Sequence, residues 1–300
     1  MAVDYIHRNS GRNPWFLVLS WGPPHDPYHQ VPQKYLDMYR DIDMKLRPNV
    51  PELIRTGSSR TMKREDIVRN YRGYYAHITA LDEQFGRLMA VLVETGEIDN
   101  TIVVYTSDHG DMLGSQGTTN KQWAYEESIK VPLIVYWKGK TIQTSSDELI
   151  GLVDLPVSLL DLLGLRFSGN VDGKDLHELF INPDAKGLEE CYIFDHIPCH
   201  QAFFRGSSEW RGIRTRRYTY ARTAADDGYM LYDNLEDPYQ MVNRINDPDY
   251  EQIKKDLKEK LNEYIQKHDK LLPWQDFIKE FGLKDEWNRS QTYFKLPLLE

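Results

Sequence analysis

The sequence predicts an α/β protein with a mostly parallel sheet flanked by helices, followed by a smaller C-terminal subdomain of antiparallel strands and a helix. Two apolar runs, 15–20 and 101–106, have the length and composition of buried strands. A long amphipathic stretch, 65–94, lies between them, and such a strand–helix–strand order is typical of parallel strands. Beyond residue 186 the pattern changes to short strand-like runs separated by turns.

Three helices follow from apolar periodicity. The longest is predicted over 65–94, where apolar residues recur at spacings of three and four, and Gly96 stands just past its end. A second is predicted over 155–163, with a proline in its first turn and Gly164 after it. A third, over 249–267, has one apolar side and is expected to pack across the C-terminal strands.

The pattern of short strand-like runs in the C-terminal third of the sequence predicts antiparallel hairpins. Its strand-like runs are Cys191–Phe194, Trp210–Thr215, Tyr218–Ala221 and Tyr229–Tyr232. The pair Asp226-Asp227, followed by a glycine between two of these runs, predicts a plain hairpin turn in preference to a metal site. The aromatic tail 271–300 is expected to dock on the body of the protein. We therefore expect a catalytic-type domain over 1–185 and an α+β subdomain over 186–300.

Composition excludes several classes of protein. The formal net charge is -9 and the basic residues are dispersed, which argues against a nucleic-acid-binding protein. We expect no membrane association, because no apolar run approaches the roughly 20 residues of a membrane span. The first 13 residues lack the apolar core of a signal peptide, so the compartment stays unspecified.

Two cysteines, Cys191 and Cys199, are too few for a disulfide framework, and we expect free thiols.

Candidate metal ligands follow the strand predicted at 101–106. Asp108 and His109 stand side by side where this strand ends, and Gly110 then lets the backbone turn. In open α/β sheets the carboxyl ends of strands are where ligands bind. Lys121 offers a cation shortly downstream. The residues alone leave a simpler interpretation open, in which Asp108 and His109 form an ordinary turn and Lys121 is a solvated surface lysine.

A histidine is held in a proline-rich loop after the other predicted strand. His25 lies in Pro23-Pro24-His25-Asp26-Pro27, directly downstream of the run 15–20. Each proline fixes its own φ and restricts the residue before it, so the loop is stiff. A surface loop histidine is the alternative reading of this position.

Several segments resemble one known family when they are read together. SDHGDMLGSQG, then Lys121, then YEESIKVPLIVYWKG is similar to the second half of the sulfatases, within the alkaline-phosphatase-like superfamily. PWFLVLSWGPPHDPY and YYAHITALDEQFGRLMAVLVETGEIDNT match upstream, and LVDLPVSLLDLLGL, WRGIRTRRYTYAR and LYDNLEDPYQMVN match downstream. The resemblance spans nearly the whole chain in the family's order. It implies an alkaline-phosphatase/sulfatase-like fold and the hydrolysis of sulfate monoesters.

The resemblance also assigns roles to the candidate residues. It implies that Asp108 and His109 are metal ligands, and that Lys121 and His25 are catalytic residues that contact the sulfate group of the substrate. A carboxylate ligand suits calcium first, with magnesium or manganese as alternatives. His109 stands where many family members have asparagine, and an imidazole ligand moves the preference towards borderline metals such as manganese.

The nucleophile expected in this family is absent. Sulfatases carry a Cys or Ser in the pattern C/S-x-P-x-R, which is converted to formylglycine, and neither Cys191 nor Cys199 fits that pattern. The paired aspartates that complete the family's metal site are absent before Asp108 as well. We therefore expect a partial sulfatase, its second half, that is inactive alone and binds metal weakly. Strands without their partners would leave an open sheet edge, through which we expect self-association.

Two further functions stay open. One is a phosphodiesterase or phosphonate monoester hydrolase of the same superfamily, which shares the Asp-His-Gly step. The other is a non-catalytic sulfatase-like protein that binds a partner or an anionic sugar. Sulfated sugars are common substrates in the family, although no residue of this sequence specifies one.

Overall fold

The computed structural model describes residues 1–55, 61–197, 209–223 and 228–294. The chain forms two compact units. The first consists of Met1–Arg47, Met62–Ser107 and Pro132–Gln143, and the second of Pro48–Thr61, Asp108–Val131 and Thr144–Glu300. The predicted domain boundary between residues 185 and 186 stays a prediction.

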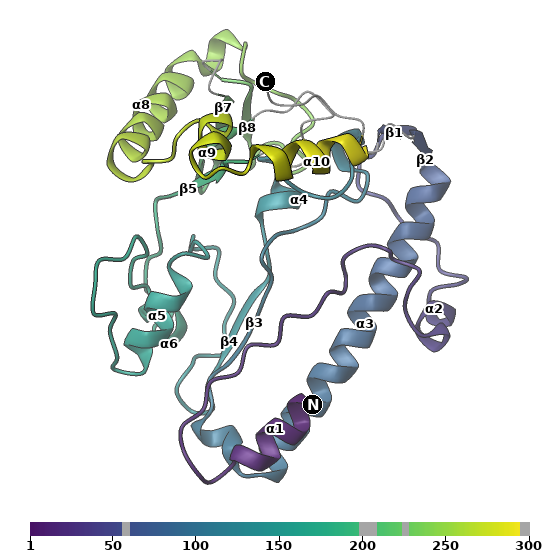
Figure 1. Ribbon diagram of the computed structural model, residues 1–300, viewed down its shortest axis with the longest axis vertical. Helices are drawn as coiled ribbons and strands as arrows, with labels where there is room; N and C mark the ends of the chain where they lie inside the picture. The colour runs from purple at the N-terminus through teal and green to yellow at the C-terminus, as the bar shows by residue number, and fades with distance from the viewer. Residues whose placement is uncertain (56–60, 198–208, 224–227, 295–300) are drawn as a thin grey trace. The chain divides into compact units, whose positions relative to one another are not determined.

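The first unit is built on one long helix. This helix, α3 (Arg64–Glu94), confirms the prediction from apolar periodicity and ends before Gly96, which has a positive φ of 74°. Helix α1 (Ala2–Asn9) lies against the last turns of α3, and α2 (Gln33–Met38) lies nearer its start (Figure 1). The core between α1 and the end of α3 contains Ile6, Val91, Leu92 and Ile98, the last from the short helix η1 (Glu97–Asn100).

The strands of the first unit pair antiparallel, which corrects the expected parallel sheet. β3 (Val103–Thr106) pairs with β4 (Leu133–Tyr136), and Val103 faces Tyr136 across the ladder. The run 15–20, expected as a parallel partner, forms no strand. It is extended instead, and Trp15 and Leu17 pack on the core of α1 and α3. The apolar run thus contributes side chains to the core, but a strand also needs a backbone partner.

The second unit contains a four-stranded antiparallel sheet, as the sequence predicted. Its order is β5-β6-β7-β8, and its strands are β5 (Glu190–Asp195), β6 (Trp210–Thr215), β7 (Tyr218–Thr223) and β8 (Met230–Asp233). Helix α8 (Glu251–His268), preceded by η3 (Pro248–Tyr250), packs on β6 and β7. Leu257 and Leu261 of α8 share a core with Ile213, Tyr220 and Leu231, which confirms the predicted packing across the sheet.

The remaining elements are short. They are β1 (Leu53–Arg55), β2 (Thr61–Lys63), η2 (Ser115–Gly117), α4 (Glu126–Ile129), α5 (Leu155–Leu162), α6 (Glu178–Ile181), α9 (Trp274–Glu280) and α10 (Lys284–Phe294). The helix predicted at 155–163 is α5. The tail docks through α9, whose Trp274 and Ile278 are buried. In the described part of the chain, no helix is long and apolar enough to span a bilayer.

Some predicted features fall outside the described residues. The turn at Asp226-Asp227, the thiol of Cys199 and the side chain of Phe294 in the tail belong to this group. Cys191 on β5 is a free thiol, as expected, and burial raises its pKa to about 11. A thiol that is so weakly acidic is a poor nucleophile.

Candidate functional site

Three of the four predicted site residues lie on one folded loop of the second unit. We call residues 108–131 the site loop. Its backbone doubles back on itself, because the N–H of Gly110 donates to the Ser128 carbonyl at 2.9 Å and the N–H of Met112 donates to the Asn120 carbonyl at 2.7 Å. The loop therefore carries Asp108, His109 and Lys121 on one hydrogen-bonded scaffold.

Gly110 is the residue on which this fold-back depends most directly. A Cβ added there would lie 2.0 Å from the carbonyl oxygen of Glu127, closer than any side-chain carbon can approach backbone. The glycine of the Asp-His-Gly step thus allows the two arms of the site loop to touch. The motif that the sequence suggested for ligand binding is also a packing requirement.

Asp108 and His109 have the geometry of a pair of metal ligands. The backbone N–H of His109 donates to Asp108 Oδ1 at 3.0 Å, and His109 Nε2 lies 3.4 Å from Asp108 Oδ2. The other ring nitrogen, Nδ1, lies 2.8 Å from the Gly110 carbonyl oxygen, an acceptor, so Nδ1 carries the proton of the neutral ring. Nε2 of the imidazole and Oδ2 of the carboxylate thus lie near each other, and both are atom types that bind divalent cations. The donor set therefore fits a divalent cation.

Lys121 is held by its two neighbours in the chain. Asn120 and Gln122 both have positive φ values, 66° and 76°, which side-chain-bearing residues adopt only where the surroundings fix them. The Asn120 carbonyl accepts the bond from Met112, and the Gln122 carbonyl accepts one from the indole N–H of Trp210 at 3.1 Å. Trp210 is buried at the start of β6, so the C-terminal sheet anchors the backbone that carries this lysine.

His25 belongs to the first compact unit, whereas the site loop belongs to the second. Its Nδ1 lies 2.8 Å from Asp26 Oδ1, and both side chains are 46% exposed. The carboxylate of Asp26 thus contacts the ring and orients it. The approach of His25 to Lys121 stays a prediction.

Sequence reasoning missed the buried polar groups that hold the site loop. Glu126 in α4 forms a two-point ion pair with Arg214 of β6, with N–O distances of 2.6 and 3.0 Å. Asn49 donates to Glu127 Oε1 at 2.8 Å, and Gln240 accepts a bond from the backbone N–H of Glu126 at 3.0 Å. Gln240 lies within LYDNLEDPYQMVN, a segment that the family resemblance had marked without assigning a role.

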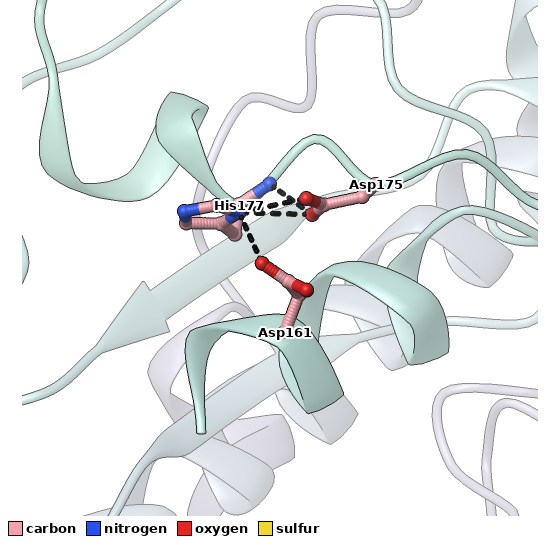
Figure 2. Close-up of side chains that lie close together, drawn as sticks. All are labelled: Asp161, Asp175 and His177. Carbon is pink, nitrogen blue, oxygen red and sulfur yellow. Dashed lines mark hydrogen bonds and ion pairs between the residues drawn. The ribbon is translucent and has the colours of Figure 1, made fainter. Parts of the chain in front are cut away.

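A second group of potential metal ligands lies elsewhere in the second unit. Figure 2 shows His177 against Asp161 and Asp175, with its Nδ1 3.1 Å from the first carboxylate and 2.9 Å from the second. Burial opposes charge on Asp175, but hydrogen bonds from the backbone N–H and ring of His177 outweigh it and lower the pKa of this carboxyl. An N–H at His177 Nδ1 can donate to both acids, so these contacts are explained without a metal ion. The sequence interpretation had assigned Asp161 only to a core helix.

Comparisons with known proteins agree on one family. A model described as sulfatase matches residues 1–165, and a model described as N-sulphoglucosamine sulphohydrolase, C-terminal, matches residues 114–267. The ulvan-active sulfatase of Formosa agariphila is 37% identical over 269 residues, which are 88% of this chain and 50% of that protein. The endo-4-O-sulfatase of Bacteroides thetaiotaomicron is 31% identical over 267 residues, which are 81% and 50% of the two chains.

Solved structures support the same fold. A structure in complex with its substrate D-glucosamine-2-N,6-O-disulfate has a TM-score of 0.61 at 29% identity, and the match covers 70% of this chain and 43% of that one. The phosphonate monoester hydrolase of Agrobacterium radiobacter has a TM-score of 0.70 at 22% identity over 89% and 60% of the two chains, which shows the fold alone. The alkaline-phosphatase/sulfatase-like α/β fold is thereby confirmed. The chain spans about half the length of the curated relatives it matches.

Proposed function

Because this chain belongs to the sulfatase family, we propose that it supplies one part of the active site of a sulfuric ester hydrolase. The site loop carries the proposal, because it holds Asp108, His109 and Lys121 on one hydrogen-bonded scaffold. The reaction proposed for the whole protein is hydrolysis of a sulfate monoester. His25 joins the site from the Pro-rich loop, as the family resemblance implies.

Sulfatases generally use a divalent metal. We propose that Asp108 and His109 hold this ion, since Oδ2 of the first and Nε2 of the second lie 3.4 Å apart. Calcium is the first candidate because of the carboxylate, and magnesium or manganese are the alternatives. Bound there, the ion would orient the ester and neutralise developing charge.

We propose that Lys121 and His25 bind the sulfate group of the substrate. A lysine ammonium and a protonated imidazole both donate charge-assisted hydrogen bonds to anionic oxygens, each worth about 1.5–3 kcal/mol. Asp26 contacts the His25 ring and orients it. Hydrogen bonds anchor the backbone that carries Lys121, and donors positioned before substrate arrives are the arrangement that stabilises charge during reaction.

The nucleophile of the family has no counterpart in these 300 residues, since none of them forms C/S-x-P-x-R. We therefore propose that the 300-residue chain alone binds the sulfate ester but does not turn it over. A sulfated sugar is the proposed substrate class. One relative is described as ulvan-active, and the complex above contains a glucosamine disulfate.

The proposal is tested with the protein expressed from its complete gene. Turnover of 4-nitrophenyl sulfate and of a nitrophenyl phosphonate ester is compared for the wild type, Lys121→Ala and Lys130→Ala. Lys130 is an exposed lysine at the end of α4 and is the matched control. We expect sulfate to be the better substrate, and Lys121→Ala to lose about 100-fold or more in kcat, as removal of one donor to a developing anion typically does.

Other results would redirect the assignment. A preference for the phosphonate ester would indicate the phosphonate hydrolase alternative within the same superfamily. Binding of a sulfated glycan with no turnover of either ester would indicate the non-catalytic alternative. Equal activity of the Lys121→Ala and Lys130→Ala proteins would remove Lys121 from the site.

A further inference from the structure

Gln240 is a fully buried amide whose side chain reaches the site loop. It is 1% exposed and has a positive φ of 52°. Its Oε1 accepts the backbone N–H of Glu126 at 3.0 Å, and its Nε2 donates to Asn234 Oδ1 at 2.8 Å. Because a backbone N–H can only donate, the bond from Glu126 fixes the orientation of the Gln240 amide, and Asn234 Nδ2 donates in turn to Thr219 Oγ1 of β7 at 2.9 Å.

The N–H of Glu126 requires a hydrogen-bond acceptor from outside α4. Glu126 is the first residue of α4, and its N–H is one of the donors that a helix cannot satisfy internally. The residue before it, Tyr125, makes no side-chain capping bond. Gln240 therefore caps α4 from a position 114 residues further along the chain.

The backbone of Gln240 and its neighbour hold a second point of the loop. Gln116 Nε2 donates to the carbonyl oxygens of Tyr239 at 3.1 Å and Gln240 at 2.8 Å. The side-chain Nδ2 of Asn49 donates to the backbone carbonyl of Tyr239 at 2.9 Å. The backbone carbonyl of Asn49 accepts a hydrogen bond from the backbone N–H of Gln116 at 2.9 Å. Gln116 has a φ of 55°, a conformation that persists where several contacts fix it.

These bonds lead directly to the candidate ligands. Gly110 lies against the Glu127 carbonyl and donates to the Ser128 carbonyl, so the single turn of α4 supports the backbone next to Asp108 and His109. A shift of Glu126 would move that support. The backbone that carries the two candidate ligands is thus anchored through α4.

We propose that Gln240 is a positioning residue, which fixes the site loop through the N–H of Glu126 and thereby sets the affinity of Asp108 and His109 for a divalent cation. The proposal rests on the proposed function, since it takes those two residues as ligands. Gln240 itself contacts neither the ion nor the substrate. The alternative is a buried glutamine that contributes stability alone.

The experiment compares Gln240→Leu, Gln240→Glu and the control Gln252→Leu in the 300-residue chain. Gln252 is an exposed glutamine on α8 that bonds to Asp256. Mn²⁺ affinity is measured by electron paramagnetic resonance, the urea midpoint by fluorescence, and hydrogen exchange on peptides that cover 108–128. We expect Gln240→Leu to weaken Mn²⁺ binding about tenfold, as loss of an outer-shell partner typically does, and to speed exchange in 108–128.

The conservative variant separates positioning from stability. Gln240→Glu keeps an oxygen for the N–H of Glu126, and Asn234 can turn its amide to donate, so we expect Mn²⁺ affinity within about twofold of the wild type. Gln252→Leu should change none of the three readouts. If Gln240→Leu lowers the urea midpoint but binds Mn²⁺ as the wild type does, or if Gln240→Glu behaves like Gln240→Leu, the proposal is wrong.

Failure of the proposed function has a different signature. If Asp108→Asn binds Mn²⁺ as tightly as the wild type, Asp108 is not a ligand, whatever Gln240 does. Exchange over 108–128 then decides the positioning claim: faster exchange in Gln240→Leu supports it and unchanged exchange overturns it. If Gln240→Leu does not fold, Asn234→Ala loosens the same amide and is measured in its place, with the same expected directions.

Discussion

Arg211 forms ion pairs with buried acidic groups at one end of the C-terminal sheet. Its partners are Glu209, at a distance of 3.3 Å, and Asp269. Asp195 lies near this group without a direct ion pair to Arg211 among the described contacts. Burial raises the pKa of Asp195 to about 7; the charge of Arg211 opposes this rise and Glu209 adds to it. At neutral pH this carboxyl is therefore protonated far more than an ordinary aspartate.

The shift at Asp195 predicts a pH-dependent stability. Its pKa is higher in the folded chain, about 7, than the ordinary value of 3.8, so the folded state holds the proton more tightly. The stabilisation is complete below the ordinary value and is lost as the pH rises through 7. We expect Asp195→Asn to raise the free energy of urea unfolding more at pH 8 than at pH 5. The exposed control Asp249→Asn should show no such difference, and an equal effect of Asp195→Asn at both pH values would refute the assignment.

Residue motifs identify only part of the site. Asp108, His109 and Lys121 stand in a contiguous segment, so the sequence could single them out. Gln240 and Arg214 bond to Glu126 across 114 and 88 residues, and nothing local marks either partner. The folded chain pairs the Glu126 carboxylate with Arg214 of β6, an ion pair that only the tertiary fold creates.

Elements with local periodicity were predicted well, and elements that need a partner were not. Helices α3, α5 and α8 follow from repeats within their own sequences. The run 15–20 is apolar like the run that forms β3, but it lacks strand pairing in the described structure. Strand formation depends on which backbone lies alongside, and a single sequence does not contain that information.

The packing of α8 on the sheet predicts an unequal response to two leucine truncations. Leu261 is fully buried against the C-terminal sheet, whereas Leu235 is 70% exposed. Leu261→Ala should lower the free energy of unfolding by about 2–5 kcal/mol, because it leaves a cavity as well as losing apolar burial. Leu235→Ala should stay within about 0.5 kcal/mol of the wild type. Urea unfolding measures both, and similar losses would show that α8 does not contribute the core described here.

The first unit exposes apolar side chains around its small sheet. Phe16 is 84% exposed, Val18 69% and Ile134 of β4 59%. In the described part of the chain the β3–β4 sheet has two strands, so each strand has an outer edge. Unpaired strand edges and contiguous apolar surface both favour association. We propose that this chain self-associates through the first unit.

Sedimentation velocity over a range of concentrations tests that proposal. The wild type should sediment faster as concentration rises, and Ile134→Lys should reduce this dependence because a charge on the face of β4 resists pairing. Met241→Lys, at a residue that is 56% exposed in the second unit, is the control. Identical behaviour of the two variants would place the association elsewhere, and a concentration-independent wild type would exclude it.

The central proposal is that a divalent cation binds to the site loop and that His25 of the Pro-rich loop joins the same site. Proton NMR of the 300-residue chain with substoichiometric Mn²⁺ tests this directly, because the paramagnetic ion broadens nearby ring resonances. The nine histidines are assigned with single His→Gln variants. We predict that His109 and His25 broaden together and that Asp108→Asn abolishes both effects. Broadening of His177 in their place, or of His109 with His25 unchanged, would contradict the account.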